Sequence, residues 1–297
     1  MVLISTKQLK QIINYFESSE TSVKFLDGFK ATFKRNIRII WQYKFTLLTG
    51  FMNTFAVASL FFFVANLVPN QRINMDNYTV SSIPFIFAGS MLVDISTRIL
   101  MKSMNSFTSE MKQGTFETLA TQPFGLKRYF VSEITFEVLY GLLFSVIYYV
   151  PVLIIFPIFN GISIKFFSIL SFIVIIIFVF LFFFALSLLA ANITILIKRG
   201  REISMVIIGI IHLLSGSLFP LSLFPEWLRI TAYFSPITSA IQAFRLCLFG
   251  GGTIADFSVW ISILVLILST VLIIILFNIT YKKIYDRIRL RGTAHEY

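Results

Sequence analysis

Long apolar stretches alternate with short polar gaps along most of the chain. The apolar runs are continuous and lack the two-residue alternation of barrel strands, which indicates helices. A helix needs about 20 mainly apolar residues to cross a membrane, and lipid offers its backbone no other hydrogen-bond partners. The runs therefore predict six membrane spans, at about 45–68, 80–100, 129–158, 166–197, 203–219 and 257–281.

The composition excludes a soluble enzyme. Of the 297 residues, 57% are hydrophobic and 13% are charged, whereas a soluble domain has about 25% charged residues. The 35 Phe and 11 Tyr residues also exclude a disordered chain. The single cysteine, Cys247, allows no internal disulfide and no cysteine-based metal site. We expect an all-α integral membrane protein without a resident metal.

The net charge of +11 is distributed by position. A nucleic-acid-binding protein gathers its basic residues on one face, but here they lie in the gaps between apolar runs, so no nucleic-acid partner is expected. In the predicted topology, the segments before the first span, after the second and fourth spans, and after the sixth span lie on one side of the membrane. These segments carry 21 of the 25 Lys and Arg residues. By the positive-inside rule this side is cytoplasmic. We therefore expect a multi-pass protein of the plasma membrane with both termini in the cytoplasm and no cleaved signal.

A basic segment precedes the first span. Residues 1–24 form a cytoplasmic segment, and in residues 25–44 apolar residues recur three or four apart with cations between them. This pattern predicts an amphipathic helix lying on the bilayer surface. The alternative is a positive-inside anchor without a further role. The residues that define the helix are Phe29, Lys34, Arg35, Arg38 and Trp41.

The gap after the second span predicts a short helix at about 115–122. Thr115 is suited to its N-cap, Glu117 lies in its first turn and Pro123 ends it. A solvated connector is the alternative.

The segment at about 220–249 is too apolar for a free loop and too interrupted to span. Pro225 and Pro236 are suited to the first positions of two short helices, with Ser235 as a cap for the second, and glycines follow at 250–252. This pattern predicts a re-entrant segment that dips into the outer leaflet. Such broken backbone needs surrounding protein or a water-filled cavity.

These features together resemble the ABC-2 family of permeases, which are membrane subunits of ABC exporters for drugs, antibiotics and polysaccharides. The resemblance rests on two motifs and covers residues 45–281 as a six-span transmembrane domain, with a basic cytoplasmic tail at 282–297. The first motif consists of Glu110, Gly114, Thr115, Glu117, Leu119 and Pro123; the second contains Gly216, Pro220, Pro225, Glu226, Trp227, Ser235, Pro236 and Arg245.

The resemblance implies a role for each motif. The helix at 115–122 would be a coupling helix that docks on an ATP-binding subunit. The surface helix would help to form the docking site for that subunit. The second motif would line the outer end of the pathway. The chain has no Gly-x-x-x-x-Gly-Lys-Ser/Thr sequence, so we expect a separate ATPase subunit, in two copies, to bind ATP and Mg²⁺. A second permease subunit, identical or different, would pair with this one.

Five ionisable residues fall within the predicted spans. Asp94 and Arg98 are spaced for a local ion pair, which we expect near the cytoplasmic end of the second span. Glu133 and Glu137 begin the third span close to Lys127 and Arg128, and we expect an electrostatic seam beside the coupling helix. His212 is mid-span, where a hydrogen-bonded packing role is expected. All five are also candidates for the pathway.

The leading hypothesis is an exporter permease for an amphipathic or lipid-like cargo, itself without enzymatic activity. A permease for lipid-linked polysaccharide is the alternative within the family. Two hypotheses from other classes remain: an ion-driven secondary transporter, and an intramembrane enzyme that uses Glu133, Glu137 and His212.

Overall fold

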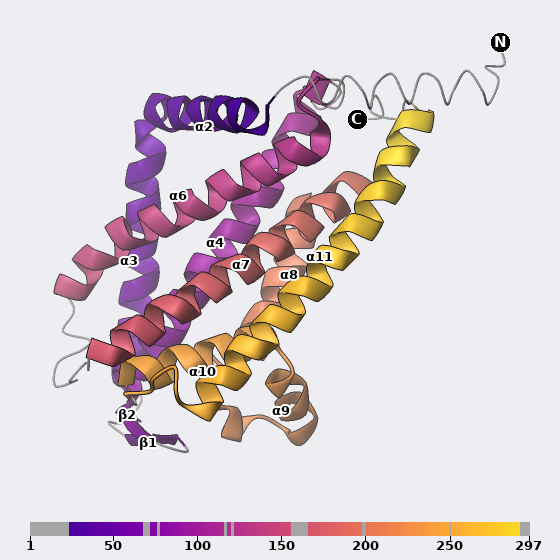
Figure 1. The fold of residues 1–297 in the computed structure, drawn as a ribbon. Helices are drawn as coiled ribbons and strands as arrows, with labels where there is room; N and C mark the ends of the chain where they lie inside the picture. The colour runs from indigo at the N-terminus through magenta and orange to yellow at the C-terminus, as the bar shows by residue number, and fades with distance from the viewer. Residues whose placement is uncertain are drawn as a thin grey trace, which may run out of the picture.

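A computed structural model describes residues 24–67, 72–75, 78–115, 118–119, 122–155, 166–197, 200–249 and 251–291. Within them, five helices are long and apolar enough to cross a membrane: α3 (Lys44–Leu67), α4 (Ser82–Lys112), α6 (Leu126–Ile155), α7 (Phe166–Ile197) and α11 (Phe257–Arg291). This arrangement confirms the predicted all-α integral membrane fold. Figure 1 shows the long helices crossing the molecule between two ends.

α4 is the central helix of the bundle. Its most apolar stretch is 78% buried inside the protein, whereas that of α3 is only 11% buried. Phe107 of α4 packs with Phe130 of α6 on one side, and Val93 and Leu100 join α7 and α10 on the other. α4 therefore separates two hydrophobic clusters and contacts both, so a movement of one cluster can be transmitted through α4 to the other.

α2 (Phe25–Gln42) lies across the end of α3 instead of continuing it (Figure 1). The helices break at Tyr43, whose backbone leaves the helical region with φ −107° and ψ 57°. Thr32 and Asn36, one turn apart, are buried against the protein, while Leu26 and Ile37 are exposed. The predicted amphipathic helix at 25–44 is thus present, with a polar stripe facing inward.

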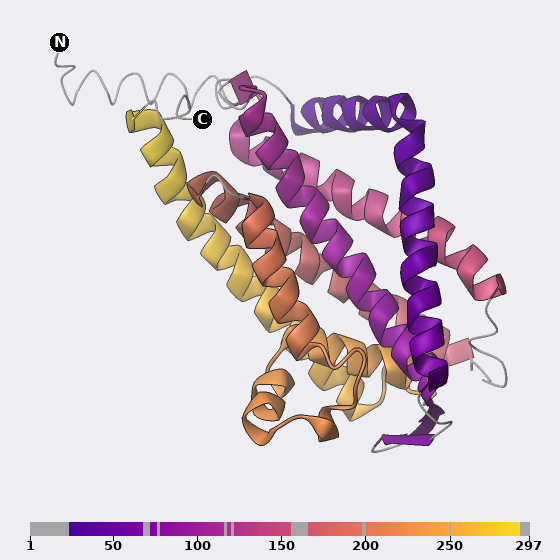
Figure 2. The same cartoon turned by 180° about the vertical axis from the view of Figure 1, so that it is seen from behind.

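The end opposite α2 holds the short elements. Strands β1 (Arg72–Met75) and β2 (Tyr78–Ser81) form an antiparallel hairpin that pairs Ile73 with Val80. α8 (Gly200–Leu214) leads to a 3-10 turn (Leu221–Leu223), α9 (Glu226–Tyr233) and α10 (Pro236–Phe249). Figure 2 shows α9 and α10 beside the hairpin end, away from α2. Pro225 directly precedes α9 and Pro236 opens α10, as the sequence predicts.

Three helix bounds differ from the predicted spans. α4 continues to Lys112 instead of stopping at 100, because Ser103, Met104 and Phe107 remain buried in the bundle although the segment is less apolar. α11 likewise runs on to Arg291, through the start of the basic tail. The helix predicted at 203–219 is α8, which ends at Leu214 with 15 residues, fewer than the roughly 20 that span a membrane. Gly216, at φ +58°, ends it with the left-handed backbone typical beyond a helix C-terminus.

Candidate functional site

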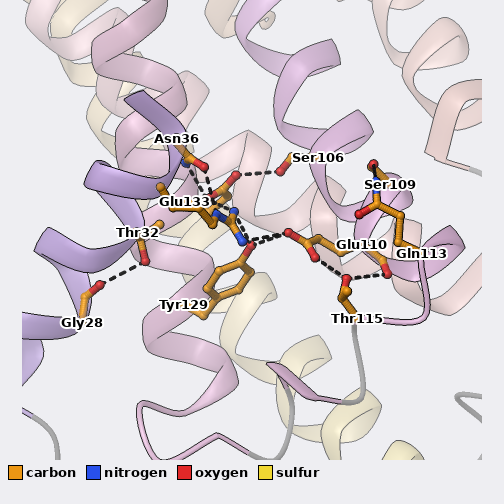
Figure 3. A network of polar contacts seen from close by, with 11 residues as sticks. Gly28, Thr32, Asn36, Ser106, Ser109, Glu110, Gln113, Thr115, Tyr129 and Glu133 are labelled. Carbon is orange, nitrogen blue, oxygen red and sulfur yellow. Dashed lines mark hydrogen bonds and ion pairs between the residues drawn. The ribbon is translucent and has the colours of Figure 1, made fainter. Parts of the chain in front are cut away.

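A network of charged side chains joins α2 to α4 and α6. Arg35 of α2 donates from Nη1 to Glu110 Oε1 of α4 at 2.9 Å, and from Nη2 to Glu133 Oε2 of α6 at 3.1 Å. The same guanidinium contacts the Tyr129 hydroxyl at 2.9 Å. Figure 3 shows Glu110 of α4 and Tyr129 and Glu133 of α6 close together. One arginine therefore connects three elements of the chain.

Glu133 is the most enclosed member of this network, with 2% of its surface exposed. Asn36 Nδ2 donates to Oε2 at 2.8 Å, and Ser106 Oγ donates to Oε1 at 2.7 Å. A buried carboxylate is costly unless it is paired and hydrogen-bonded, and here both oxygens have donors. Asn36 and Thr32 share the inward face of α2, so the periodicity of that helix directs its polar stripe at α6.

Arg35 stays cationic in this setting. Burial by itself lowers the pKa of the Arg35 guanidinium, but Tyr129, Glu133 and Glu110 outweigh burial and hold the pKa above its ordinary value. The arginine is consequently a permanent positive charge, and the network changes only if its members move apart.

The network extends to the turn that follows α4. The Thr115 hydroxyl donates to the Glu110 carbonyl oxygen at 3.1 Å and also to the Glu110 carboxylate. Gly114, with φ +69°, gives this turn its left-handed residue. The Thr115 carbonyl oxygen accepts the Leu119 N–H at 3.0 Å, as in the first turn of a helix, and the predicted capping role of its side chain stays a prediction.

The predicted coupling helix at 115–122 is described only in part. Residues 118–119 are helical, and Leu119 is half-buried against the cluster that contains Phe107 and Phe130. Pro123 is exposed in a turn, and the next residue, Phe124, is buried. Glu117, which the sequence places in the first turn, lies outside the described residues.

A second ion pair lies deeper in the bundle. Lys102 Nζ of α4 is 3.0 Å from Glu137 Oε2 of α6, and it stands 3.2 Å from the centre of the Tyr140 ring. Among the described residues, ion pairs of the expected electrostatic seam join Glu133 to Arg35 and Glu137 to Lys102. Lys127 is six residues from Glu133, so the two side chains point about 120° apart around the helix, and Lys127 donates to Asn278 of α11.

Asp94 and Arg98 form the expected ion pair, with Arg98 Nε 2.8 Å from Asp94 Oδ2. Tyr149 of α6 donates to the same oxygen at 2.7 Å. Asp94 is the thirteenth residue of α4, about 18 Å from its first, and the expected position of the pair near the cytoplasmic end of the span stays a prediction.

Arg245 lies in the interior, not in an outer loop. Only 2% of its surface is exposed, and its guanidinium stands 3.5 Å from the centre of the Phe85 ring. It donates to the carbonyl oxygens of Phe85, Gly216 and Ser217. This arginine therefore ties α10 to the first turn of α4 and to the turn after α8.

Gly89 of α4 leaves room for this arrangement. A Cβ at Gly89 would stand 2.2 Å from Arg245 Nη2 and 2.5 Å from the Ser217 carbonyl oxygen. We expect Gly89→Ala to lower the thermal midpoint by roughly 2–6 °C in mild detergent, since overpacking costs about 1–3 kcal/mol. Gly209→Ala on α8 is the matched control, because nothing lies within 4 Å of that position. Equal midpoints for the two variants would contradict the tight packing.

The other predicted site residues occupy three settings. Lys34 and Arg38 are exposed on α2, Phe29 is half-buried beside Phe33, and 67% of Trp41 is exposed. Around α9, Pro225, Glu226 and Trp227 are exposed and Pro220 is half-buried; Ser235 and Gly216 are buried, and Pro236 is half-buried. His212 is exposed on α8, and its expected packing or pathway role stays a prediction.

Sequence reasoning missed the neutral partners of the charges. Three side chains donate to carboxylates: Asn36, Ser106 and Tyr149. The Tyr129 hydroxyl accepts from Arg35. Sequence reasoning also missed the cation Lys102, which pairs with Glu137. The one usable signal was Asn36, a small polar residue one turn from Thr32 on the same face of α2. Nothing in the local sequence distinguishes the others from solvated residues near a helix end.

Comparison with known families identifies the fold. The profile of the ABC-2 type transporter family matches residues 27–249, more than half of the chain. A comparison with curated proteins found no match. The match begins in α2 and ends with α10, so it contains the charged network and the Arg245 contacts. The chain belongs to the ABC-2 type transporter family, as a multi-pass permease component of an ABC transporter complex that includes a partner ATPase.

Proposed function

We propose that this chain is the membrane subunit of an ABC exporter that moves an amphipathic or lipid-like cargo out across the cytoplasmic membrane. Two copies of a separate ATPase subunit would supply ATP hydrolysis with Mg²⁺, and a second permease would complete the pathway. The observation that supports this proposal best is the Arg35 network, because it connects α2, α6 and the turn after α4 at one end of the bundle.

The charge distribution supports a cytoplasmic position for that end. α2, the turn after α4 and the end of α11 lie at the same end of the molecule in Figure 1, and the segments at this end hold most of the Lys and Arg residues of the chain. Anionic lipid and the positive-inside rule both favour such a distribution on the cytoplasmic face. The turn at Gly114 and Thr115 therefore faces the compartment in which a partner ATPase would bind ATP.

Coupling follows from the contacts. A displacement of the segment after Thr115 pulls on Glu110, and through Arg35 it reaches α2 and Glu133. Because Glu133 belongs to α6 and Glu110 to α4, the bundle cannot change shape at this end without rearranging the network. ATP would then shift the balance between inward-closed and outward-open states by its different affinities for them.

The charges inside the bundle support a cargo without strong net charge. Asp94 pairs with Arg98, and Glu137 pairs with Lys102. Each pair is neutral overall, so neither offers a fixed charge that would select a strongly anionic substrate. The surrounding side chains are mostly aliphatic and aromatic, which suits a drug, an antibiotic or a lipid.

The same contacts disfavour an intramembrane enzyme. Both oxygens of Glu133 accept hydrogen bonds, and Glu137 faces a lysine. A general acid or base needs a free position toward its substrate, and Glu133 has its donors already. His212 lies on α8, exposed, and not on the helices that hold the two carboxylates.

We expect Arg35→Lys to uncouple the complex. Lysine keeps the charge but cannot hold Glu110, Glu133 and Tyr129 at once, because it lacks the planar fork of arginine. In proteoliposomes with the partner ATPase, basal ATP hydrolysis should stay within about twofold, while its stimulation by cargo should fall roughly fivefold or more. A lipophilic drug, a fluorescent phospholipid and a lipid-linked sugar would be compared as cargo, which also separates the two exporter hypotheses.

Arg38→Lys is the matched control, since Arg38 is exposed on the same helix. Its stimulation should equal that of the unmodified protein. Unchanged stimulation in Arg35→Lys would contradict a coupling role for the network.

A further inference from the structure

A cavity of about 340 Å³ lies beside the charged network. Its walls come from the end of α2, the start of α3 and the facing sides of α4 and α6. The volume is within the range of about 300–1,000 Å³ that is typical of small-molecule sites. The bend at Tyr43 creates this space, because α2 turns across the bundle end where a continuous helix would pass straight on.

The cavity has an apolar wall and a polar wall. Ile39, Ile40 and Leu47 line it from α2 and α3, while Lys102 and Gln113 line it from α4. Nearby Trp41 and Tyr43 are 67% and 64% exposed. Exposed tryptophan and tyrosine mark the level of lipid headgroups in membrane proteins. The cavity therefore lies at a bilayer interface and can accept an amphipathic molecule.

Lys102 is the polar group best placed for a ligand. It lies eight residues before Glu110 on α4, about 12 Å deeper along the helix. Its ammonium is 3.0 Å from Glu137 Oε2, but the pair is not aligned as a hydrogen bond, and that buried oxygen has no hydrogen-bond partner among the described residues. The Lys102 side chain is still 42% exposed. Part of its hydrogen-bonding capacity is thus free to bind an acceptor in the cavity.

The balance of charge limits the kind of ligand. Arg35 and Lys102 face Glu110, Glu133 and Glu137 around the cavity, two cations against three carboxylates. A polyanion would be repelled by the excess negative charge. A zwitterion adds no net charge, and each of its ends has a complement here: the ammonium of Lys102 for a phosphate, and carboxylates with aromatic faces for an amine.

We propose that this cavity binds the zwitterionic headgroup of a phospholipid, with its phosphate on Lys102 and its ammonium toward the unsatisfied oxygen of Glu137, and with its acyl chains along the apolar wall of α3. A lipid bound in this way would fill the space inside the bend between α2 and α3, next to the Arg35 network. The inference depends on the membrane embedding of the chain and not on the cargo or direction proposed above.

The test measures which lipid stays with the protein. The full chain with its partner ATPase is placed in nanodiscs made of equal parts phosphatidylethanolamine and phosphatidylglycerol, then released and weighed by native mass spectrometry. We expect the ethanolamine lipid to be retained at least fivefold over the glycerol lipid. Preference for phosphatidylglycerol, or no retained lipid, would overturn the proposal.

The variants separate binding from folding. Lys102→Ala leaves Glu137 as an unpaired buried carboxylate and can unfold the protein, so Lys102→Met combined with Glu137→Gln is used, which removes both charges together. This double variant should lose the lipid preference. Lys44→Ala is the control, because Lys44 is exposed over Trp41 near the bend and is not part of the cavity wall. Equal retention in the double variant would refute the role of Lys102.

Two sources of the headgroup are distinguished by adding ATP. Loss of the bound lipid during turnover identifies it as cargo, and retention identifies a resident bilayer lipid; both support the headgroup assignment. If the protein instead binds only detergent in the cavity while phospholipid is present, the assignment is wrong.

Discussion

Replacing Arg245 by methionine is expected to lower the free energy of unfolding by about 3–5 kcal/mol, and the thermal midpoint in mild detergent by roughly 10 °C. The guanidinium is almost fully buried and donates to the carbonyl oxygens of Phe85, Gly216 and Ser217. Methionine has a similar length but donates nothing. Three buried carbonyl oxygens would lose a donor, each at a cost of about 1–3 kcal/mol.

The effect should be local to the junction of α4, α8 and α10. Arg245→Lys keeps the charge but cannot reach three acceptors, so we expect it to recover only a small part of the loss. Arg229→Met on α9, where the side chain is half-buried, is the control and should shift the midpoint by about 1–2 °C at most. Equal midpoints for Arg245→Met and Arg229→Met would show that the carbonyl contacts do not hold this junction together.

The long helices could be predicted because their signal is local. The run at 166–197 matches α7 at both ends, and the starts of α3, α6 and α11 lie within three residues of their predicted positions. Each of these runs is mainly apolar, so hydropathy alone marks it. The starts of the two short helices α9 and α10 could be predicted for an equally local reason, because proline suits the first turn of a helix.

The end of α4 could not be predicted in the same way. Its last turns contain Ser103, Thr108 and Lys112, which read as a polar gap, yet Ser103 and Thr108 are buried. Their hydroxyls donate to carbonyl oxygens one turn back, at Ile99 and Met104, so they are satisfied within the helix. Burial of these residues depends on neighbours from other helices, and hydropathy along one helix carries no information about them.

The pairing of residues within the charged network could not be predicted either, because the partners lie far apart in the sequence. Arg35 and Glu133 are 98 residues apart, and Arg35 and Glu110 are 75 apart. Helix periodicity identifies which face a residue occupies, but not which helix lies opposite that face. The sequence therefore predicted Arg35, Glu110 and Glu133 as separate features: a surface cation, a coupling-motif residue and an electrostatic seam. Only the fold shows that they are one site.

Glu133→Ala is expected to release α2 from the bundle and to lower the free energy of unfolding by about 3–5 kcal/mol. Arg35, Asn36 and Ser106 would all lose an acceptor in a site where water does not replace it. Hydrogen exchange at the amides of α2 should accelerate by at least tenfold, since local opening becomes easier. Glu226→Ala on α9 removes an exposed carboxylate and should leave exchange in α2 unchanged.

A double-mutant cycle would then show whether the network acts as a unit. If Arg35 and Glu133 stabilise the protein mainly through each other, the loss in Arg35→Ala combined with Glu133→Ala should fall short of the sum of the single losses by about 1–3 kcal/mol. Additive losses would mean that each residue acts through other contacts, and the path from the Gly114 turn to α6 would have to run elsewhere. A large coupling energy would mean that α2 and α6 move together. This joint movement is the mechanical condition that coupling at this end of the permease requires.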